Sequence, residues 1–99
     1  PVLMINGTAD VGPMSDAGPP WHDNGFHLAS QNICLMHVKG AGHYLGGIDS
    51  ALRSPSGDTT AARRTAVLDA TIAFLDHSLD RKTPAAERWP ALRSTLPCK

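Results

Sequence analysis

Two continuous apolar runs of strand length dominate the first half of the chain. They are Val2–Ile5 and Ile33–Val38, and neither shows a strict alternation of apolar and polar positions. A continuous run is typical of a strand that is buried on both faces, as in a parallel sheet covered by helices. The pattern therefore predicts two buried parallel strands.

The segment between these runs, residues 12–32, is long enough to cross over between two parallel strands. Its first half, up to Pro20, is too rich in Gly and Pro for regular structure, and a short helix is expected at Asp23–Ser30. The clearest helix is predicted over Thr60–Leu79, with Asp58 or Thr59 as its N-cap. Its apolar stripe consists of Leu68, Ile72, Leu75 and Leu79, widened by Val67 and Phe74.

A second, shorter helix is predicted near the end of the chain. Thr83 and Pro84 have the pattern of an N-cap followed by a first-turn proline, and Trp89 falls inside the helix that they open. Pro90 is expected to break this helix, because proline lacks an N–H group and its ring collides with the preceding turn.

The order of elements indicates an α/β fold with an incomplete sheet. With 99 residues the chain holds one domain at most, and it opens inside an apolar strand. Two parallel strands and one long helix leave strand edges open and part of the sheet uncovered. We therefore expect residues 1–99 to be the C-terminal portion of a single domain whose N-terminal part lies outside this chain.

Composition and charge exclude several classes of function. Hydrophobic residues make up 41% and charged residues 18%, which is ordinary for a globular protein. Nine basic residues balance nine acidic ones, so the surplus of positive charge that nucleic-acid binding needs is missing. No apolar run approaches the ~20 residues of a membrane span. We expect neither a nucleic-acid partner nor a membrane span.

The two cysteines suggest little chemistry. Cys34 lies in an apolar run, where a free cysteine behaves as a small buried hydrophobe, and Cys98 is next to the last residue, where chains are usually mobile. A disulfide between them is conceivable in an exported protein, but the expectation from the sequence is that they stay apart. No spacing of cysteines and histidines matches a structural zinc site.

Two ionisable residues follow the two predicted strands. Asp10 ends the turn Asn6–Asp10, and His43 ends the segment Lys39–His43. In an open parallel sheet, catalytic groups gather beyond the carboxyl ends of the strands. A carboxylate there can fix the tautomer of an imidazole, which leaves its other nitrogen to act as general base for a hydroxyl or thiol.

These residues resemble the last two strands of an α/β-hydrolase. Gly7–Asp10 and Gly40–His43 match the turns that carry the acid and the base, in the family's chain order of nucleophile, acid and base. The stretch Gly40–Gly47, and Phe74–Leu79 followed by a Trp-containing tail, are similar to predicted dienelactone hydrolases and platelet-activating-factor acetylhydrolase-like esterases. The resemblance covers Pro1 to about Leu96.

The resemblance implies a carboxylic-ester hydrolase that acts on a small-molecule ester without a cofactor. Asp10 and His43 would be the catalytic acid and base. The chain departs from the family because none of its serines lies in a Gly-x-Ser-x-Gly elbow. The serine or cysteine nucleophile and the oxyanion hole would belong to the missing N-terminal part, so this chain alone is expected to be inactive.

Other interpretations of these residues stay open. Asp10 could be a turn carboxylate, and Asp16 is a rival acid six residues further along. His43 could be a loop histidine without a role, in which case the chain could be a small non-catalytic α/β interaction module with a structural aspartate and histidine. His37, within the second strand, is expected to be a core or edge histidine with a hydrogen-bond partner.

One further cluster of residues is a candidate metal site, and two aromatic residues are candidates for lining a substrate pocket. His22, Asp23 and His27 could ligate a metal, but their spacing fits no standard motif and a solvated loop or pocket rim is the preferred interpretation. We therefore predict no metal site. Trp21 and Tyr44 are candidates for lining the substrate pocket. Tyr44 directly follows His43, whereas a lone tryptophan in a loop, such as Trp21, more often has only a packing role.

Overall fold

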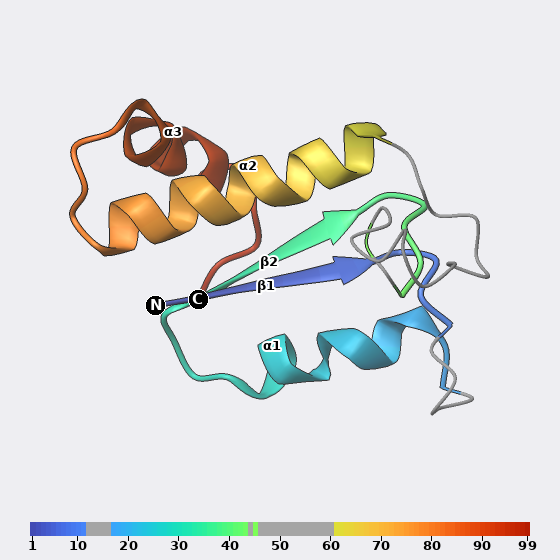
Figure 1. Ribbon diagram of the computed structural model, residues 1–99. Helices are drawn as coiled ribbons and strands as arrows, with labels where there is room; N and C mark the ends of the chain where they lie inside the picture. The colour runs from blue at the N-terminus through green and yellow to red at the C-terminus, as the bar shows by residue number, and fades with distance from the viewer. Residues whose placement is uncertain (12–16, 44, 46–60) are drawn as a thin grey trace.

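The computed structural model describes residues 1–11, 17–43, 45 and 61–99 of the chain (Figure 1). Within these ranges the chain is an α/β structure with strands, helices and an incomplete sheet. The elements are β1 (Val2–Gly7), the 3₁₀ helix η1 (Pro19–Asp23), α1 (Asn24–Leu28), β2 (Ile33–Val38), α2 (Ala61–Ser78) and α3 (Pro84–Arg93).

The two strands are parallel neighbours, which confirms the prediction from the apolar runs. They pair in register, from Val2 beside Ile33 to Gly7 beside Val38. Most of β2 is buried, whereas most of β1 is only half-buried. Within the described residues β1 has no second strand partner, so the sheet is incomplete on that side.

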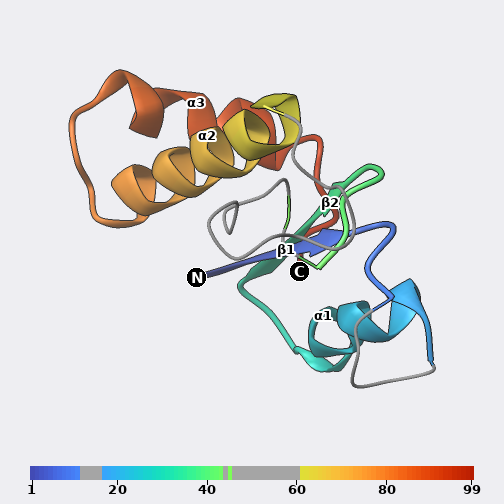
Figure 2. The same cartoon turned by 45° about the vertical axis from the view of Figure 1, so that its right-hand side comes forward.

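Helices cover both faces of the sheet (Figures 1 and 2). One face carries Ile33 and Leu35, which pack with Phe26 of α1. The opposite face carries Cys34, which packs with Ala73 of α2 and Trp89 of α3. Because successive side chains of a strand point to opposite faces, the continuous apolar run of β2 supplies both cores.

The packed face of α2 differs from the predicted one. The residues that α2 buries are Val67, Ala70, Ala73 and Asp76. The predicted stripe is instead largely exposed to solvent, with Leu68, Ile72, Leu75 and Leu79 between 46% and 68% exposed. Small side chains on the buried face allow α2 to approach the sheet and α3 closely, and bulky residues therefore lie on the outside of the helix.

A buried carboxylate organises the turn between α2 and α3. Asp76 accepts a hydrogen bond from the hydroxyl of Thr83 at 2.7 Å and one from Arg81 at 3.3 Å. The hydrogen bond from Thr83 lowers the pKa of the Asp76 carboxyl below its ordinary value. Burial acts to raise this pKa, and the hydrogen bond and positive charge of Arg81 lower it further. Thr83 is also the N-cap of α3 and accepts from the N–H of Ala86, as predicted.

The prediction that Pro90 ends the second helix is wrong. α3 continues through Pro90 to Arg93. The carbonyl of Pro90 accepts a hydrogen bond from the N–H of Ser94 at 3.1 Å, so the helical pattern resumes one turn later. Trp89 is buried beside Phe74, and this packing compensates for the hydrogen bond that the proline cannot make.

The expectation that Cys34 and Cys98 stay apart is also wrong, because they form a disulfide. The last residues of the chain lie antiparallel to β2 along the edge opposite β1. Their backbone contacts are Lys99 N–H to Ile33 O at 2.8 Å and Leu35 N–H to Pro97 O at 2.9 Å. Cys34 is buried, as expected, but the sequence held no signal for its pairing with Cys98, which was expected at a mobile chain end.

The last side chain of the chain fixes the end of α1. The Nζ atom of Lys99 donates to the carbonyls of Phe26, His27 and Ala29, at 2.9–3.2 Å. It also lies over the ring of Phe26, 5.0 Å from its centroid. A cation is favourable at a helix C-terminus, where carbonyl groups lack intrahelical partners.

Removing the disulfide should destabilise the chain strongly. The bridge joins residues 64 positions apart, and a loop of that length corresponds to about 4 kcal/mol in the chain-entropy description. The double variant Cys34→Ala/Cys98→Ala should therefore unfold at a clearly lower urea concentration. Dithiothreitol should lower the midpoint of the unmodified chain and leave that of the double variant unchanged. Equal midpoints for the two proteins would contradict a structural bridge.

Candidate functional site

The loops that follow the two strands are joined to each other by hydrogen bonds. The N–H of Thr8 donates to Val38 O at 3.2 Å, and the N–H of Gly40 donates to the hydroxyl of Thr8 at 2.8 Å. The N–H of Ala9 then donates to Ala41 O at 2.9 Å. Hydrogen bonding between the two chain segments thus extends beyond the strand ends as far as the residue before Asp10, although the parallel pairing itself ends at Gly7 and Val38.

Small residues make this close approach possible. A Cβ atom at Gly7 would collide with the backbone carbonyl of Ala41, which is fully buried. Gly40 has a φ of +72°, a left-handed conformation that glycine adopts without strain. The two Gly-containing turns that the sequence singled out therefore have a backbone role, which is to bring Asp10 and His43 to the same edge of the sheet.

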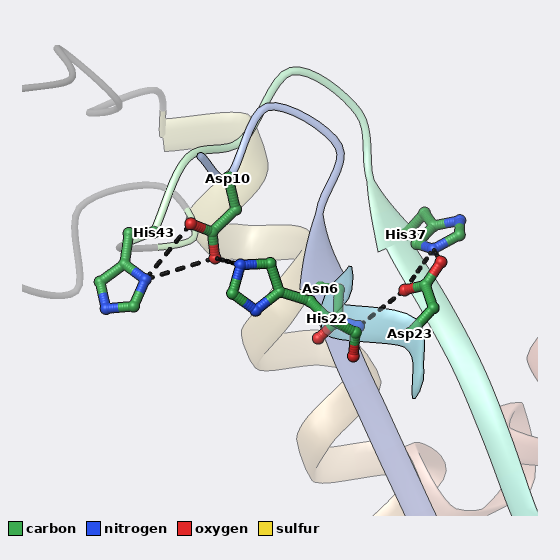
Figure 3. A network of polar contacts seen from close by, with 6 residues as sticks. All are labelled: Asn6, Asp10, His22, Asp23, His37 and His43. Carbon is green, nitrogen blue, oxygen red and sulfur yellow. Dashed lines mark hydrogen bonds and ion pairs between the residues drawn. The ribbon is translucent and has the colours of Figure 1, made fainter. Parts of the chain in front are cut away.

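Asp10 and His43 meet at this edge (Figure 3). The Nδ1 atom of His43 lies 3.3 Å from each carboxylate oxygen of Asp10. The contact is slightly longer than the range of about 2.6–3.2 Å for a formed catalytic hydrogen bond, as unliganded sites often show. The Asp10 side chain is 10% exposed and that of His43 is 54% exposed. A mostly buried carboxylate thus holds an imidazole that solvent can reach.

The same carboxylate contacts a second imidazole, which the sequence did not connect with it. The Nε2 atom of His22, from η1, lies 3.3 Å from Oδ2 of Asp10. His22 lies close to Asp23 and His27 along the chain, and the three residues form the metal-site candidate of the sequence. The structure separates this group, since His22 points to Asp10 and Asp23 points to the strands (Figure 3). No local pattern marks a contact of this kind between a crossover segment and a strand end.

Asp23 fastens η1 to both strands. It accepts from Asn6 Nδ2 at 2.8 Å, and one of its oxygens lies 2.8 Å from Nε2 of His37. Asn6 and His37 are register partners in the sheet, so one carboxylate spans the pair. Asn6 Nδ2 also donates to the carbonyl of His22 at 2.8 Å. His37 is thus an edge histidine with a partner, as predicted.

The pKa of the Asp23 carboxyl lies below its ordinary value of 3.8. Burial acts to raise this pKa, but the hydrogen bonds from Asn6 and His37 and the charges of His37 and His27 together outweigh it. Asp23 is therefore a charged anchor for η1, and it holds its charge into mildly acidic solution.

The remaining candidates have different outcomes. Trp21 lies in η1, is 48% exposed, and places the edge of its ring against His22 at a centroid distance of 5.1 Å. Tyr44 and Asp16 lie outside the described residues. Across residues 1–11, 17–43, 45 and 61–99, no group of three or more potential ligands is arranged to hold a metal ion.

Two further findings concern the described residues away from Asp10 and His43. A groove of about 310 Å³ lies at the opposite, amino end of the strands, and Asn32, Phe74 and Trp89 contribute to its lining without Asp10 or His43. Among the helices of the described segments, none is both long enough and apolar enough to traverse a bilayer.

A scan against protein-family models gave no match to this chain, and neither did searches of curated proteins and of solved structures. The functional interpretation of the site therefore rests on its residues and their geometry.

Replacing the anchor of η1 should lower stability in a pH-dependent way. Asp23→Asn keeps an oxygen for Asn6 but removes the charge next to His37, which should cost about 1–2 kcal/mol of unfolding free energy near neutral pH. Because the folded-state pKa of Asp23 is lowered, this contribution is present above about pH 4 and is lost as the pH falls through the lowered pKa.

Urea denaturation between pH 2 and pH 7 measures this difference. The matched control is Asp80→Asn, since the Asp80 side chain is 89% exposed and should change stability by less than about 0.5 kcal/mol. A difference between the chain and Asp23→Asn that is independent of pH would contradict a charged anchor.

Proposed function

We propose that this chain supplies the acid and base of the catalytic triad of a carboxylic-ester hydrolase with α/β-hydrolase architecture. His43 is the general base and Asp10 is the acid that orients it. The contact between Nδ1 of His43 and the buried Asp10 carboxylate carries the proposal. It is supported by the position of both residues beyond the carboxyl ends of neighbouring parallel strands, where open sheets collect their reactive groups.

In the proposed reaction His43 accepts a proton at Nε2, the ring nitrogen directed away from Asp10 (Figure 3). The proton comes from a serine hydroxyl or cysteine thiol, whose oxygen or sulfur attacks the carbonyl carbon of the ester. The imidazolium then donates this proton to the leaving alcohol, which yields an acyl-enzyme. Water repeats the sequence with the same base and releases the carboxylic acid.

Asp10 keeps the imidazole in the productive form throughout. A carboxylate that accepts from Nδ1–H favours the tautomer with the lone pair on Nε2, and its charge stabilises the imidazolium. Burial of Asp10 strengthens both effects, because electrostatic interactions are stronger where water is excluded.

The nucleophile belongs to a part of the domain outside these residues. No serine of the chain stands in a Gly-x-Ser-x-Gly context. Cys34 and Cys98 are joined to each other, which removes both from consideration as nucleophiles. The proposed partners are therefore the remaining part of the same domain and a small-molecule ester.

The convergence of the two side chains favours this proposal over a non-catalytic interaction module. A turn carboxylate would bond only to backbone groups, and a loop histidine without a role would have no reason to face it. Asp10 instead contacts imidazole nitrogens from two separate segments of the chain.

Substitution of the pair in the complete open reading frame that encodes this chain should abolish or cripple ester hydrolysis. His43→Ala removes the base and should reduce turnover of p-nitrophenyl butyrate to background. Asp10→Asn permits the wrong tautomer and should lower kcat by roughly 10⁴-fold, as in serine proteases. Both variants should retain the far-UV circular dichroism of the unmodified protein.

The matched controls are His77→Ala in the last turn of α2 and Asp69→Asn on its exposed face, which should each change the rate by less than about tenfold. Asp16→Asn, the rival acid, should be equally mild. The 99-residue chain by itself should not react with a fluorophosphonate probe. Full activity in Asp10→Asn together with a crippled Asp16→Asn would refute the assignment of the acid.

A further inference from the structure

The outer side of α2 carries a row of large apolar side chains that the described part of the chain leaves largely exposed. This outer row consists of Leu68, Ile72, Leu75 and Leu79, which are between 46% and 68% exposed. The helix packs on the sheet and on α3 (Figure 1) through the opposite side, with Val67, Ala70, Ala73 and Asp76. A contiguous exposed apolar surface of this kind marks an interaction site.

The spacing of the outer row is that of a coiled-coil seam. Its members are successively four, three and four residues apart, which places Leu68 and Leu75 at heptad position d, and Ile72 and Leu79 at position a. Leu79 directly follows α2, and its N–H donates to the carbonyl of Leu75 at 2.9 Å, so it continues the helical pattern. A β-branched residue at a with leucine at d favours a pair of parallel helices.

Two opposite charges flank the outer row. Arg64 is at heptad position g and Asp69 at the next position e. Neither side chain forms an ion pair within the described residues. They do not face each other on their own helix, because only residues three or four positions apart do so. In a parallel helix pair, however, a residue at g faces the residue at e five positions later in the other helix.

We propose that α2 joins two copies of this chain into a parallel dimer, with the outer rows in contact along its axis. Arg64 of each copy then meets Asp69 of the other, so two equivalent ion pairs close the seam. A two-fold interface needs such a self-complementary surface. The charge pattern therefore favours a second copy as the occupant, since another protein would have to supply both charges at the same spacing.

The dimer is a weak one. The outer row spans only about two heptads, and its four half-exposed side chains bury less than the ~800 Å² per partner of a stable interface. The outer row contains neither Asp10 nor His43. The dimer therefore stands or falls independently of the proposed hydrolase function.

Charge reversal in the product of the complete open reading frame tests the ion pairs. Sedimentation equilibrium between roughly 10 µM and 1 mM should show a monomer–dimer equilibrium, as for other weak interfaces. Arg64→Asp brings two carboxylates together at each pair and should raise Kd at least about tenfold, and so should Asp69→Arg.

The double variant Arg64→Asp/Asp69→Arg separates pairing from a general effect of charge. It restores opposite charges across the seam and should return Kd to within about threefold of the original value. The matched control is Arg88→Asp on the exposed surface of α3, which makes the same change in net charge away from the outer row and should leave Kd unchanged.

A cysteine in the outer row tests the direction of the helices. Position 68 lies beside position 68 of the other copy in a parallel pair, but beside position 79 in an antiparallel pair. Oxidation with diamide should therefore join Leu68→Cys chains into a covalent dimer, since Cys34 and Cys98 are already joined to each other. Ala62→Cys, which is exposed on α2 outside the outer row, should stay monomeric on a non-reducing gel.

Three results would overturn the proposal. The first is a monomer at every concentration up to about 1 mM, which is also the result expected if the remaining part of the domain covers the outer row. The second is a dimer whose Kd is insensitive to Arg64→Asp or is not restored in the double variant, because another surface then joins the copies. The third is a Leu68→Cys protein that does not crosslink.

Discussion

Hydrogen bonding between the two loops that follow β1 and β2 is the constraint on which the candidate site depends. Two strands in register place Gly7 beside Val38, and the loop hydrogen bonds that follow join Thr8 to Val38 and, with the strand register no longer kept, Ala9 to Ala41. Backbone atoms and the hydroxyl of Thr8 make these hydrogen bonds, and the residues at the closest approach are Gly7 and Ala41. A side chain at Gly7 would push the two loops apart, and Asp10 would then leave the reach of His43. The distance between Asp10 and His43 thus depends on the geometry of these two loops.

The face of the sheet that η1 and α1 cover changes from apolar to polar along the strands. On the face covered by η1 and α1, Ile33 and Leu35 pack with Phe26, and the next residue of β2 on that face is His37. At His37 the contact between η1 and the sheet changes from apolar packing to polar contacts, because the Asp23 carboxylate of η1 contacts Asn6 of β1 and His37 of β2. Apolar packing holds η1 and α1 against the sheet but lets them shift along it, whereas hydrogen bonds with defined directions do not allow such a shift. This polar end therefore determines where η1 places its side chains.

The sequence predicted what local pattern and strand order control. The two apolar runs indicated parallel strands, and their following turns located Asp10 and His43 at one edge of the sheet. The contact of His22 with Asp10 depends on the path of a Pro- and Gly-rich crossover, for which periodicity carries no information. The outward-facing stripe of α2 and the continuation of α3 through Pro90 also escape prediction from local sequence, because both depend on tertiary packing. Tertiary packing on small residues and on Trp89 outweighs the local preference in both cases.

The disulfide bears on the site through a chain of contacts, although it lies at the other end of the strands. It holds the last residues against β2, so that Lys99 can bind the carbonyls at the end of α1. Asn6 donates to His22 and Asp23, at the junction of η1 and α1. The short η1–α1 unit is therefore attached at its middle and at its C-terminal end, which helices of this length need because they are unstable by themselves. The orientation of His22 toward Asp10 follows from both attachments together.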